Sequence, residues 1–183
     1  MSLSAQTDRD MFDAYLREDM SVWQAYVDTI HITPYTLHNN SLLYEYGFCG
    51  YMVDRDKAHA KPYVQRFREH VETQKAHLPK GHYEMYMSAV LVYELRLHES
   101  FHPAKAMSLA KKAAQLAPND PRTLTYYGTS LFYAPKPFGS KEEALTYFQR
   151  AYDIMQAPKW QYCWLKPNAK MYIDQCQDKL KKH

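Results

Sequence analysis

The stretch that decides the fold reads Ala106-Met-Ser-Leu-Ala110-Lys-Lys-Ala113-Ala-Gln-Leu116-Ala-Pro118-Asn-Asp120-Pro121. One stripe of a helix holds Ala106, Ala110, Ala113 and Leu116, and it is narrow enough for a neighbouring helix to approach closely. Pro118 ends this helix, Asp120 can cap the next one, and Pro121 suits a first turn, where its missing N–H has no helical partner to lose. A second helix therefore follows almost at once, which predicts a helical hairpin.

The same arrangement returns further along the chain. The second helix ends near a proline-rich loop, residues 135–139, and Ser140-Lys-Glu-Glu143 then has the sequence of a capping box. In such a box the serine accepts a bond from one free backbone N–H, and the glutamate reaches back to another. The spacing of Ala106, Ala110 and Ala113 is repeated after this box as Ala144, Phe148 and Ala151.

This pattern resembles the tetratricopeptide repeat (TPR), a hairpin of two helices in about 34 residues. The residues that carry the resemblance are Tyr127, Gly128 and Leu131, followed by Ala144, Phe148 and Ala151. The chain departs from the family in a longer loop around Pro137 and in Leu124, which stands where the family usually has tryptophan. The resemblance implies an all-α fold: a right-handed superhelix of about three TPR-like hairpins with flanking N- and C-terminal helices.

Two earlier hairpins follow from the same frame. The first helix of the middle hairpin should hold Val90, Tyr93 and Leu97, with Glu94 where the family prefers glycine. A degenerate hairpin is indicated upstream by Leu43, Tyr46 and Gly47, followed by Ala60, Val64 and Phe67. A strand or a long loop between residues 40 and 70 would contradict it.

Two amphipathic helices flank the hairpins. The first should place these residues on one face: Phe12, Tyr15, Leu16, Val22, Trp23, Tyr26, Val27 and Ile30. The second should open at Pro167 and turn these residues inward: Ala169, Tyr172, Ile173, Cys176 and Leu180. Lys179, Lys181 and Lys182 near its end suit the negative end of the helix dipole.

The predicted layout is one TPR-like domain, residues 1–183. Its parts are an N-terminal helix at 7–31, a degenerate repeat at 40–80, repeats at 83–119 and 120–157, and a C-terminal capping helix at 167–182.

Composition excludes several classes of protein. A chain of 183 residues with 46% hydrophobic residues is large enough for one domain with a core, and five glycines argue against a β-sandwich or a nucleotide-binding α/β fold. The net charge of +3 and the scattered Lys and Arg argue against nucleic-acid binding. No segment is long and apolar enough to span a membrane. Packing between hairpins would use most of the seventeen tyrosines.

The start of the chain predicts a compartment. Ser2-Leu-Ser-Ala5-Gln6 looks like the tail of a bacterial secretory signal peptide with a cleavage point after Ala5. We therefore expect a periplasmic or secreted protein, with a cytoplasmic one as the alternative. Export would permit a disulfide between Cys163 and Cys176, whereas buried free thiols are the default for all three cysteines.

One motif argues for an enzyme. His98-Glu99-Ser-Phe-His102 matches the H-E-x-x-H pattern of zinc metallopeptidases, whose chemistry needs both histidines on one continuous helix. Pro103 follows at once and pushes His102 away from helical geometry, so the two imidazoles should diverge. The peptidase is therefore the minor alternative, and we expect no catalytic residue, no metal ligand and no cofactor.

The TPR resemblance implies instead a non-enzymatic scaffold that binds a protein or peptide. The first helices of successive hairpins would line a concave aromatic groove, formed by Tyr44, Phe48, Tyr51, Leu91, Leu95, His98, Thr125, Thr129, Phe132 and Tyr133. Arg122 is the residue placed to read a carboxylate. Such a groove favours apolar or extended segments. In the alternative, the N-terminal helix or a second copy of the chain fills the groove, and the protein is a self-associating structural module, such as a homodimer.

Overall fold

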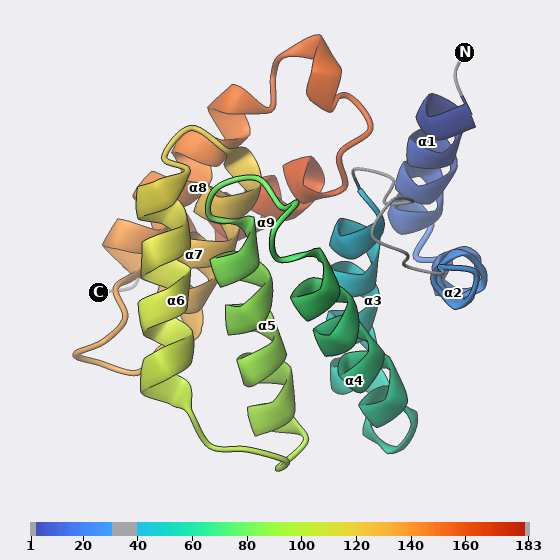
Figure 1. The fold of residues 1–183 in the computed structure, drawn as a ribbon. Helices are drawn as coiled ribbons and strands as arrows, with labels where there is room; N and C mark the ends of the chain where they lie inside the picture. The colour runs from blue at the N-terminus through green and yellow to red at the C-terminus, as the bar shows by residue number, and fades with distance from the viewer. Residues whose placement is uncertain (1–2, 31–39, 182–183) are drawn as a thin grey trace. The chain divides into compact units, whose positions relative to one another are not determined.

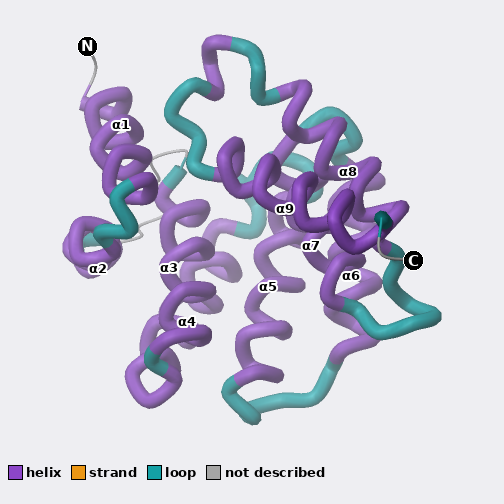
Figure 2. Tube along the Cα trace, turned by 180° about the vertical axis from the view of Figure 1, so that it is seen from behind, coloured by secondary structure: helices purple, strands orange, loops and turns teal. Residues whose placement is uncertain are grey.

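The computed structural model describes the backbone of residues 3–30 and 40–181 (Figure 1) and the side chains of residues 7–30 and 40–181. Within these ranges every regular element is a helix, and Figure 2 shows helices joined by loops without a strand. The chain divides into two compact units, one of residues 1–79 and 86–106 and the other of residues 80–85 and 107–183. Each unit is described by itself, and the predicted single domain stays a prediction.

The first unit begins with two helices, where the sequence predicted one. These are α1 (Leu3–Leu16) and α2 (Met20–Asp28). The chain breaks at Glu18, whose φ of 56° is left-handed, and the Asp19 carboxylate caps α2 by accepting a bond from the Ser21 N–H at 3.3 Å. The indole of Trp23 donates to the Met11 carbonyl at 2.8 Å and ties the two helices together.

The residues that face inward in α1 and α2 differ in part from the prediction. Leu16, predicted to be buried, is 55% exposed, because α1 turns Ala14 inward and Leu16, two residues later at about 100° per residue, lies on the opposite side of the helix. Met11 and Ala14 are buried in α1, and Trp23 and Val27 are buried in α2, the last two as predicted.

The next two helices, α3 (Ser41–Arg55) and α4 (Lys57–Gln74), form a hairpin with Asp56 as its connecting residue. The segment is helical where a strand or long loop would have contradicted a hairpin. These predicted core residues are buried: Leu43, Ala60, Val64 and Phe67. The helical hairpin is therefore present, while its status as a degenerate repeat stays a prediction.

Most of α5 (His82–Arg96) also belongs to the first unit. Tyr93 donates to the Tyr46 carbonyl of α3 at 2.9 Å. Glu94, which stands where the family prefers glycine, accepts two bonds from the Arg68 guanidinium of α4 at 2.8 and 2.7 Å. The departure from the family pattern thus has a local use, because a charge-assisted pair joins α4 to α5.

The second unit contains most of α6 (Pro103–Leu116), followed by α7 (Pro121–Tyr133), α8 (Lys141–Ile154), the short 3₁₀ helix η1 (Pro158–Trp160) and α9 (Leu165–Leu180). The predicted start of α7 is confirmed, because Asp120 accepts a bond from the Arg122 N–H at 2.9 Å and Pro121 opens the helix. The Ser140 hydroxyl accepts from the Glu143 N–H at 3.1 Å, as the first half of the capping box requires.

The small-residue stripe of α6 differs from the prediction at one position. Ala106, Ala110 and Ala113 are buried as expected, but Leu116 is 41% exposed. At 3.6 residues per turn the stripe continues through Ala114, which is buried, and Leu116 falls to its side.

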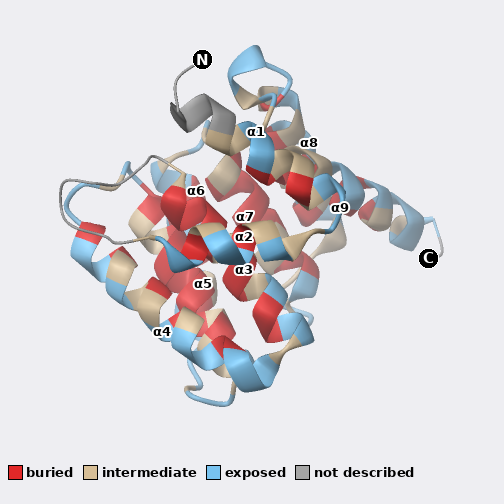
Figure 3. Ribbon diagram, turned by 90° about the vertical axis from the view of Figure 1, so that its right-hand side faces the viewer, coloured by how far each residue is buried: buried red, intermediate tan, exposed pale blue. Residues whose placement is uncertain are grey.

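Helices α7, α8 and α9 pack through one aromatic contact. Gly128 of α7 faces the Phe148 ring of α8, and that ring stacks on Tyr172 of α9 at 4.8 Å. Ala144 and Ala151 are buried on either side of Phe148, and Figure 3 colours the buried positions of these helices red. Helix α9 starts two residues before the predicted Pro167, and its predicted inward residues are buried except for the half-buried Leu180.

Candidate functional site

The predicted aromatic stripe on α3 starts under the N-terminal helices. The Tyr44 ring lies edge-on to Trp23 at 5.5 Å and to Tyr26 at 5.4 Å, and its hydroxyl donates to Asp8 of α1. Tyr44 is therefore buried by α1 and α2 of its own chain. At this position the N-terminal helices cover the ring, as the alternative describes, while the groove itself stays a prediction.

The stripe reaches the surface one and two turns later. Phe48 is buried, with its ring edge-on to Tyr63 of α4 at 5.0 Å and stacked on Tyr51 at 6.4 Å. Tyr51 is 40% exposed. Along the α3 stripe, Tyr44 is thus covered by α1 and α2, Phe48 is buried against α4, and Tyr51 is exposed.

Tyr51 opens into a hollow between α2, α3 and α4, with a volume of about 850 Å³. We call it the α2–α4 hollow. The residues that line it are Gln24, Asp28, Tyr51, Met52, Arg55, Asp56, Ala58, His59, Pro62, Tyr63 and Arg66. All of them belong to the first unit, and the volume lies within the range of about 300–1,000 Å³ that is usual for binding sites.

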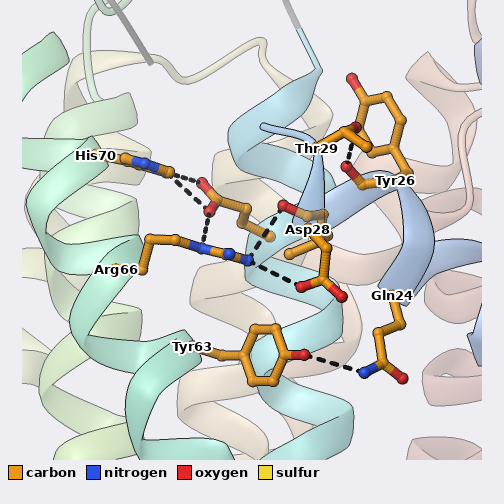
Figure 4. A network of polar contacts seen from close by, with 9 residues as sticks. Gln24, Tyr26, Asp28, Thr29, Tyr63, Arg66 and His70 are labelled. Atoms are coloured by element: carbon orange, nitrogen blue, oxygen red, sulfur yellow. Dashed lines mark hydrogen bonds and ion pairs between the residues drawn. The ribbon is translucent and has the colours of Figure 1, made fainter. Parts of the chain in front are cut away.

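Arg66 holds the helices around the hollow together (Figure 4). Its Nη2 donates to the Val27 carbonyl of α2 at 3.1 Å and lies 3.7 Å from the Asp28 carboxylate. Its Nε lies 3.6 Å from the carboxylate of Glu45 on α3, which is only 1% exposed. His70 Nδ1 lies 2.8 Å from both oxygens of Glu45. A buried charge on α3 is thus matched from α4, and the same guanidinium fixes the end of α2.

The other polar groups of the hollow differ in whether they are engaged. Gln24 donates to the Tyr63 hydroxyl at 3.0 Å, and His59 Nδ1 lies 2.9 Å from both oxygens of Asp56. Arg55 is exposed, and among the described side chains it has no hydrogen-bond or ion-pair partner. Among the described side chains, Arg55 is thus a cation of the hollow without an acidic partner.

Pro62 adds a backbone acceptor. It lies inside α4, where it has no N–H to donate to the Ala58 carbonyl one turn earlier. Both residues line the hollow. The Ala58 carbonyl therefore lacks its usual helical donor in a residue that lines the hollow.

The remaining predicted groove residues on α5 and its C-terminal turn do not form an open surface. Leu91 is buried, Leu95 is half-buried, and His98 is exposed beyond the end of the helix. The expectation that they continue the α3 stripe stays a prediction.

The predicted residues of α7 are mostly engaged within the second unit. Thr125 is buried, and the Thr129 hydroxyl donates to the Thr125 carbonyl at 2.9 Å. Phe132 is covered by Tyr172 of α9 at 5.3 Å. Tyr133 is 67% exposed, together with Phe138 in the following loop at 70%. The C-terminal helix thus covers Phe132, as α1 and α2 cover Tyr44, and leaves Tyr133 exposed.

Lys141 and Lys179 lie over the covered Phe132 ring, with Nζ to centroid distances of 4.1 and 4.6 Å. Burial lowers the pKa of Lys141, and the charge of Lys179 lowers it further.

The sequence predicts that Arg122 reads a partner's carboxylate, but in the structure its guanidinium is engaged within its own unit. Its Nε and Nη2 donate to Asp120 at 2.9 and 2.7 Å, and its guanidinium lies over the Trp160 ring at 5.3 Å. His82, which is buried, also contacts Asp120 through Nε2 at 2.9 Å. Burial acts to raise the pKa of Asp120, but the hydrogen bonds and charges of His82 and Arg122 outweigh it and hold that pKa well below its usual range. The cluster fixes the start of α7.

The H-E-x-x-H motif lies outside any single helix. Helix α5 ends at Arg96, His98 has a left-handed φ of 60°, and α6 begins only at Pro103. Glu99 pairs with Lys61 at 3.0 Å. The two histidines are therefore not one turn apart on a helix, which is the geometry that zinc peptidases require.

Two other features bear on the site. Within the described ranges, no three His, Cys, Asp or Glu side chains gather in a group that could hold a metal ion. Cys49, Cys163 and Cys176 are not joined by disulfides, so the bridge between Cys163 and Cys176 is not formed. None of the described helices combines the length and apolar character that a membrane crossing requires.

Sequence reasoning missed Gln24, Arg55, Pro62 and Tyr63 as site residues. Pro62 inside a helical pattern was the one local signal. Gln24 of α2 joins Arg55 and Tyr63 of the α3–α4 hairpin through the contacts that α2 makes with α3 and α4, and those contacts have no sequence signature.

Known proteins offer no template for the hollow. No protein-family model, curated protein or solved structure matches this chain. Its function has to follow from the residues that line the hollow and the contacts they make.

Proposed function

We propose that the chain is a non-enzymatic protein-interaction module that holds an extended segment of a partner protein in the α2–α4 hollow. The observation that carries the proposal is the exposed Tyr51 ring, which lines a hollow of about 850 Å³. Aromatic rings at the centre of a concave surface supply most of the binding energy in many interfaces. Tyr51 also belongs to the aromatic stripe that the sequence predicts for partner binding.

The shape of the hollow favours a peptide over a small molecule. Small-molecule sites bury about 70–90% of the ligand surface. Here several lining residues are themselves exposed, among them Arg55, Ala58 and Pro62. A segment that enters and leaves an open hollow fits this arrangement better than an enclosed ligand does.

We further propose that the chain holds about three TPR-like hairpins, of which the first is degenerate, stacked in a right-handed superhelix with flanking N- and C-terminal helices. The buried Ala144, Phe148 and Ala151 and the close approach of Gly128 to Phe148 support this relation. The periplasmic or secreted location stays a prediction.

Site-directed photo-crosslinking tests the binding function. A benzoylphenylalanine at position 58, inside the hollow, should crosslink a partner in an extract of the source cells. The same group at position 73, towards the other end of α4, should not. Tyr51→Ser should abolish the crosslink, while Phe101→Ser, which removes another exposed ring of the first unit, should leave it unchanged. Equal capture from both positions, or capture that survives Tyr51→Ser, would contradict the proposal.

Self-association is the second candidate function, and the exposed Tyr133 and Phe138 favour it. Exposed rings grouped at one loop are typical of contact surfaces. Sedimentation velocity over a range of concentrations tests this function: a dimer that dissociates in Phe138→Ser would support it, and a monomer at all concentrations would exclude it.

A further inference from the structure

We infer that the segment bound in the α2–α4 hollow carries an acidic side chain two residues away from an aromatic or other large apolar side chain. This inference rests on the proposed function and names the chemistry of the partner. It follows from the charge, the spacing and the backbone acceptor of the hollow.

The charge of the hollow favours an acidic side chain on the bound segment. Its other charged lining residues are engaged: Asp56 by His59, and Asp28 and Arg66 by one another. Arg55 is the charged lining residue that has no partner among the described side chains. A guanidinium binds a carboxylate through two parallel N–H donors, which makes Asp, Glu or a C-terminal carboxylate its natural ligand.

The spacing of Arg55 and Tyr51 sets the distance between the acidic side chain of the bound segment and its apolar side chain. They stand four positions apart on α3, so they are neighbours on one helix face, with Cβ atoms about 5–6 Å apart. In an extended segment, alternate side chains point the same way and lie about 6.6 Å apart, at about 3.3 Å per residue. When an acidic side chain of the bound segment pairs with Arg55, the side chain two residues away in that segment therefore lies over the Tyr51 ring, beside Met52 and Pro62.

The backbone of such a segment also finds a partner. The Ala58 carbonyl, without its usual donor because of Pro62, can accept one main-chain N–H of the bound segment. A main-chain bond of this kind holds an extended peptide without regard to its sequence, so the acid and the ring would set the specificity.

Titration of the full chain with short peptides tests the inference. The probe is the acetylated and amidated peptide Gly-Ser-Asp-Ser-Phe-Ser-Gly, followed by ¹⁵N–¹H correlation spectra. Matched peptides replace Asp by Asn, replace Phe by Ser, or exchange the two positions to test the opposite chain direction. The protein variants are Arg55→Gln, Tyr51→Ser and, as a control with the same loss of charge, the neighbouring Lys57→Gln, which lies outside the lining.

We expect shifts at the hollow for the Asp and Phe peptide or for its reversed form. Replacing Asp by Asn should weaken binding about threefold to fivefold, because an exposed ion pair contributes only modestly. Arg55→Gln should weaken binding of the Asp peptide by the same factor and remove the difference between Asp and Asn, whereas Lys57→Gln should preserve that difference. This non-additivity is the mark of a direct contact.

The possible failures are distinguishable. Binding that is lost in Tyr51→Ser but is equal for Asp and Asn peptides would overturn the inferred acid and leave the proposed function standing. An Asp preference that persists in Arg55→Gln would assign the acid to another cation and overturn the inference in the same way. No shift at the hollow for any peptide at millimolar concentration would overturn both the inference and the proposed function.

Discussion

Gly128→Ala should destabilise the chain although alanine is the better helix former. A Cβ at position 128 would lie 2.9, 3.0 and 3.1 Å from three ring atoms of Phe148. The ring cannot retreat, because it is fully buried and is stacked on Tyr172 at 4.8 Å with an interplanar angle of 6°. Overpacking of this kind costs about 1–3 kcal/mol, against about 1 kcal/mol gained from helix propensity. We therefore expect a net loss of roughly 0–2 kcal/mol in the free energy of unfolding.

Urea unfolding followed by circular dichroism measures this loss, and a second glycine provides the control. A Cβ at Gly50 would meet only the hydroxyl end of Tyr93, at 3.1 Å for its oxygen. That side-chain end can shift by a few tenths of an ångström, so Gly50→Ala should be neutral or stabilising by up to about 1 kcal/mol. Gly128→Ala should have the lower midpoint of the two.

A double mutant tests the cause. Phe148→Leu alone should destabilise by leaving unfilled space in the core. In that background the clash is gone, so Gly128→Ala should no longer destabilise and should show its helix-propensity gain. If Gly128→Ala were more stable than the wild type, as helix propensity alone would make it, or if its effect were unchanged with Leu at position 148, the packing argument would be refuted.

Three further predictions follow from the titratable groups. Asp120→Asn keeps a capping side chain but loses the charge. Because the pKa of Asp120 is depressed in the folded state, the variant should be less stable than the wild type at pH 7. The difference between their urea midpoints should close as the pH falls below the ordinary carboxyl pKa of about 4. Lys179→Gln removes a like charge, so the pKa of Lys141, followed by NMR titration, should rise towards its usual value, and no change would contradict the assigned pair. Burial raises the pKa of Cys49 well above its usual value, so iodoacetamide at neutral pH should label the half-buried Cys163 first by mass spectrometry, and early labelling of Cys49 would argue against its burial.

Local rules predicted the helices of the second unit well. The Asp120-Pro121 start and the serine of the capping box act over three residues, and both form as expected. The buried spacing of Ala144, Phe148 and Ala151 is likewise a property of one helix. Such signals need no knowledge of what lies across the core.

The errors arose where a distant contact or a single backbone angle decides the outcome. Glu18 adopts a left-handed conformation that a glutamate seldom takes, so the pattern across it was read as one helix. Arg122 was expected to read a partner's carboxylate, whereas Asp120 and Trp160 of the same unit engage it. The hollow was missed because it depends on where α2 is seated.

The seating of α2 also decides how ready the hollow is to bind. Glu45 keeps a carboxylate inside the first unit, and Arg66 and His70 are the groups that balance it. Because the same Arg66 also binds the last turn of α2, a displacement of α2 would disturb the partner of a buried charge, and uncompensated buried charges cost several kcal/mol. The wall that α2 contributes is therefore held in place before any ligand arrives. A segment that binds there needs to order only itself, and the affinity lost to ordering the protein is small. Arg66→Met should accordingly loosen α2 and weaken segment binding even though the aromatic and acidic contacts remain, and unchanged binding in that variant would show that α2 is seated by its apolar contacts alone.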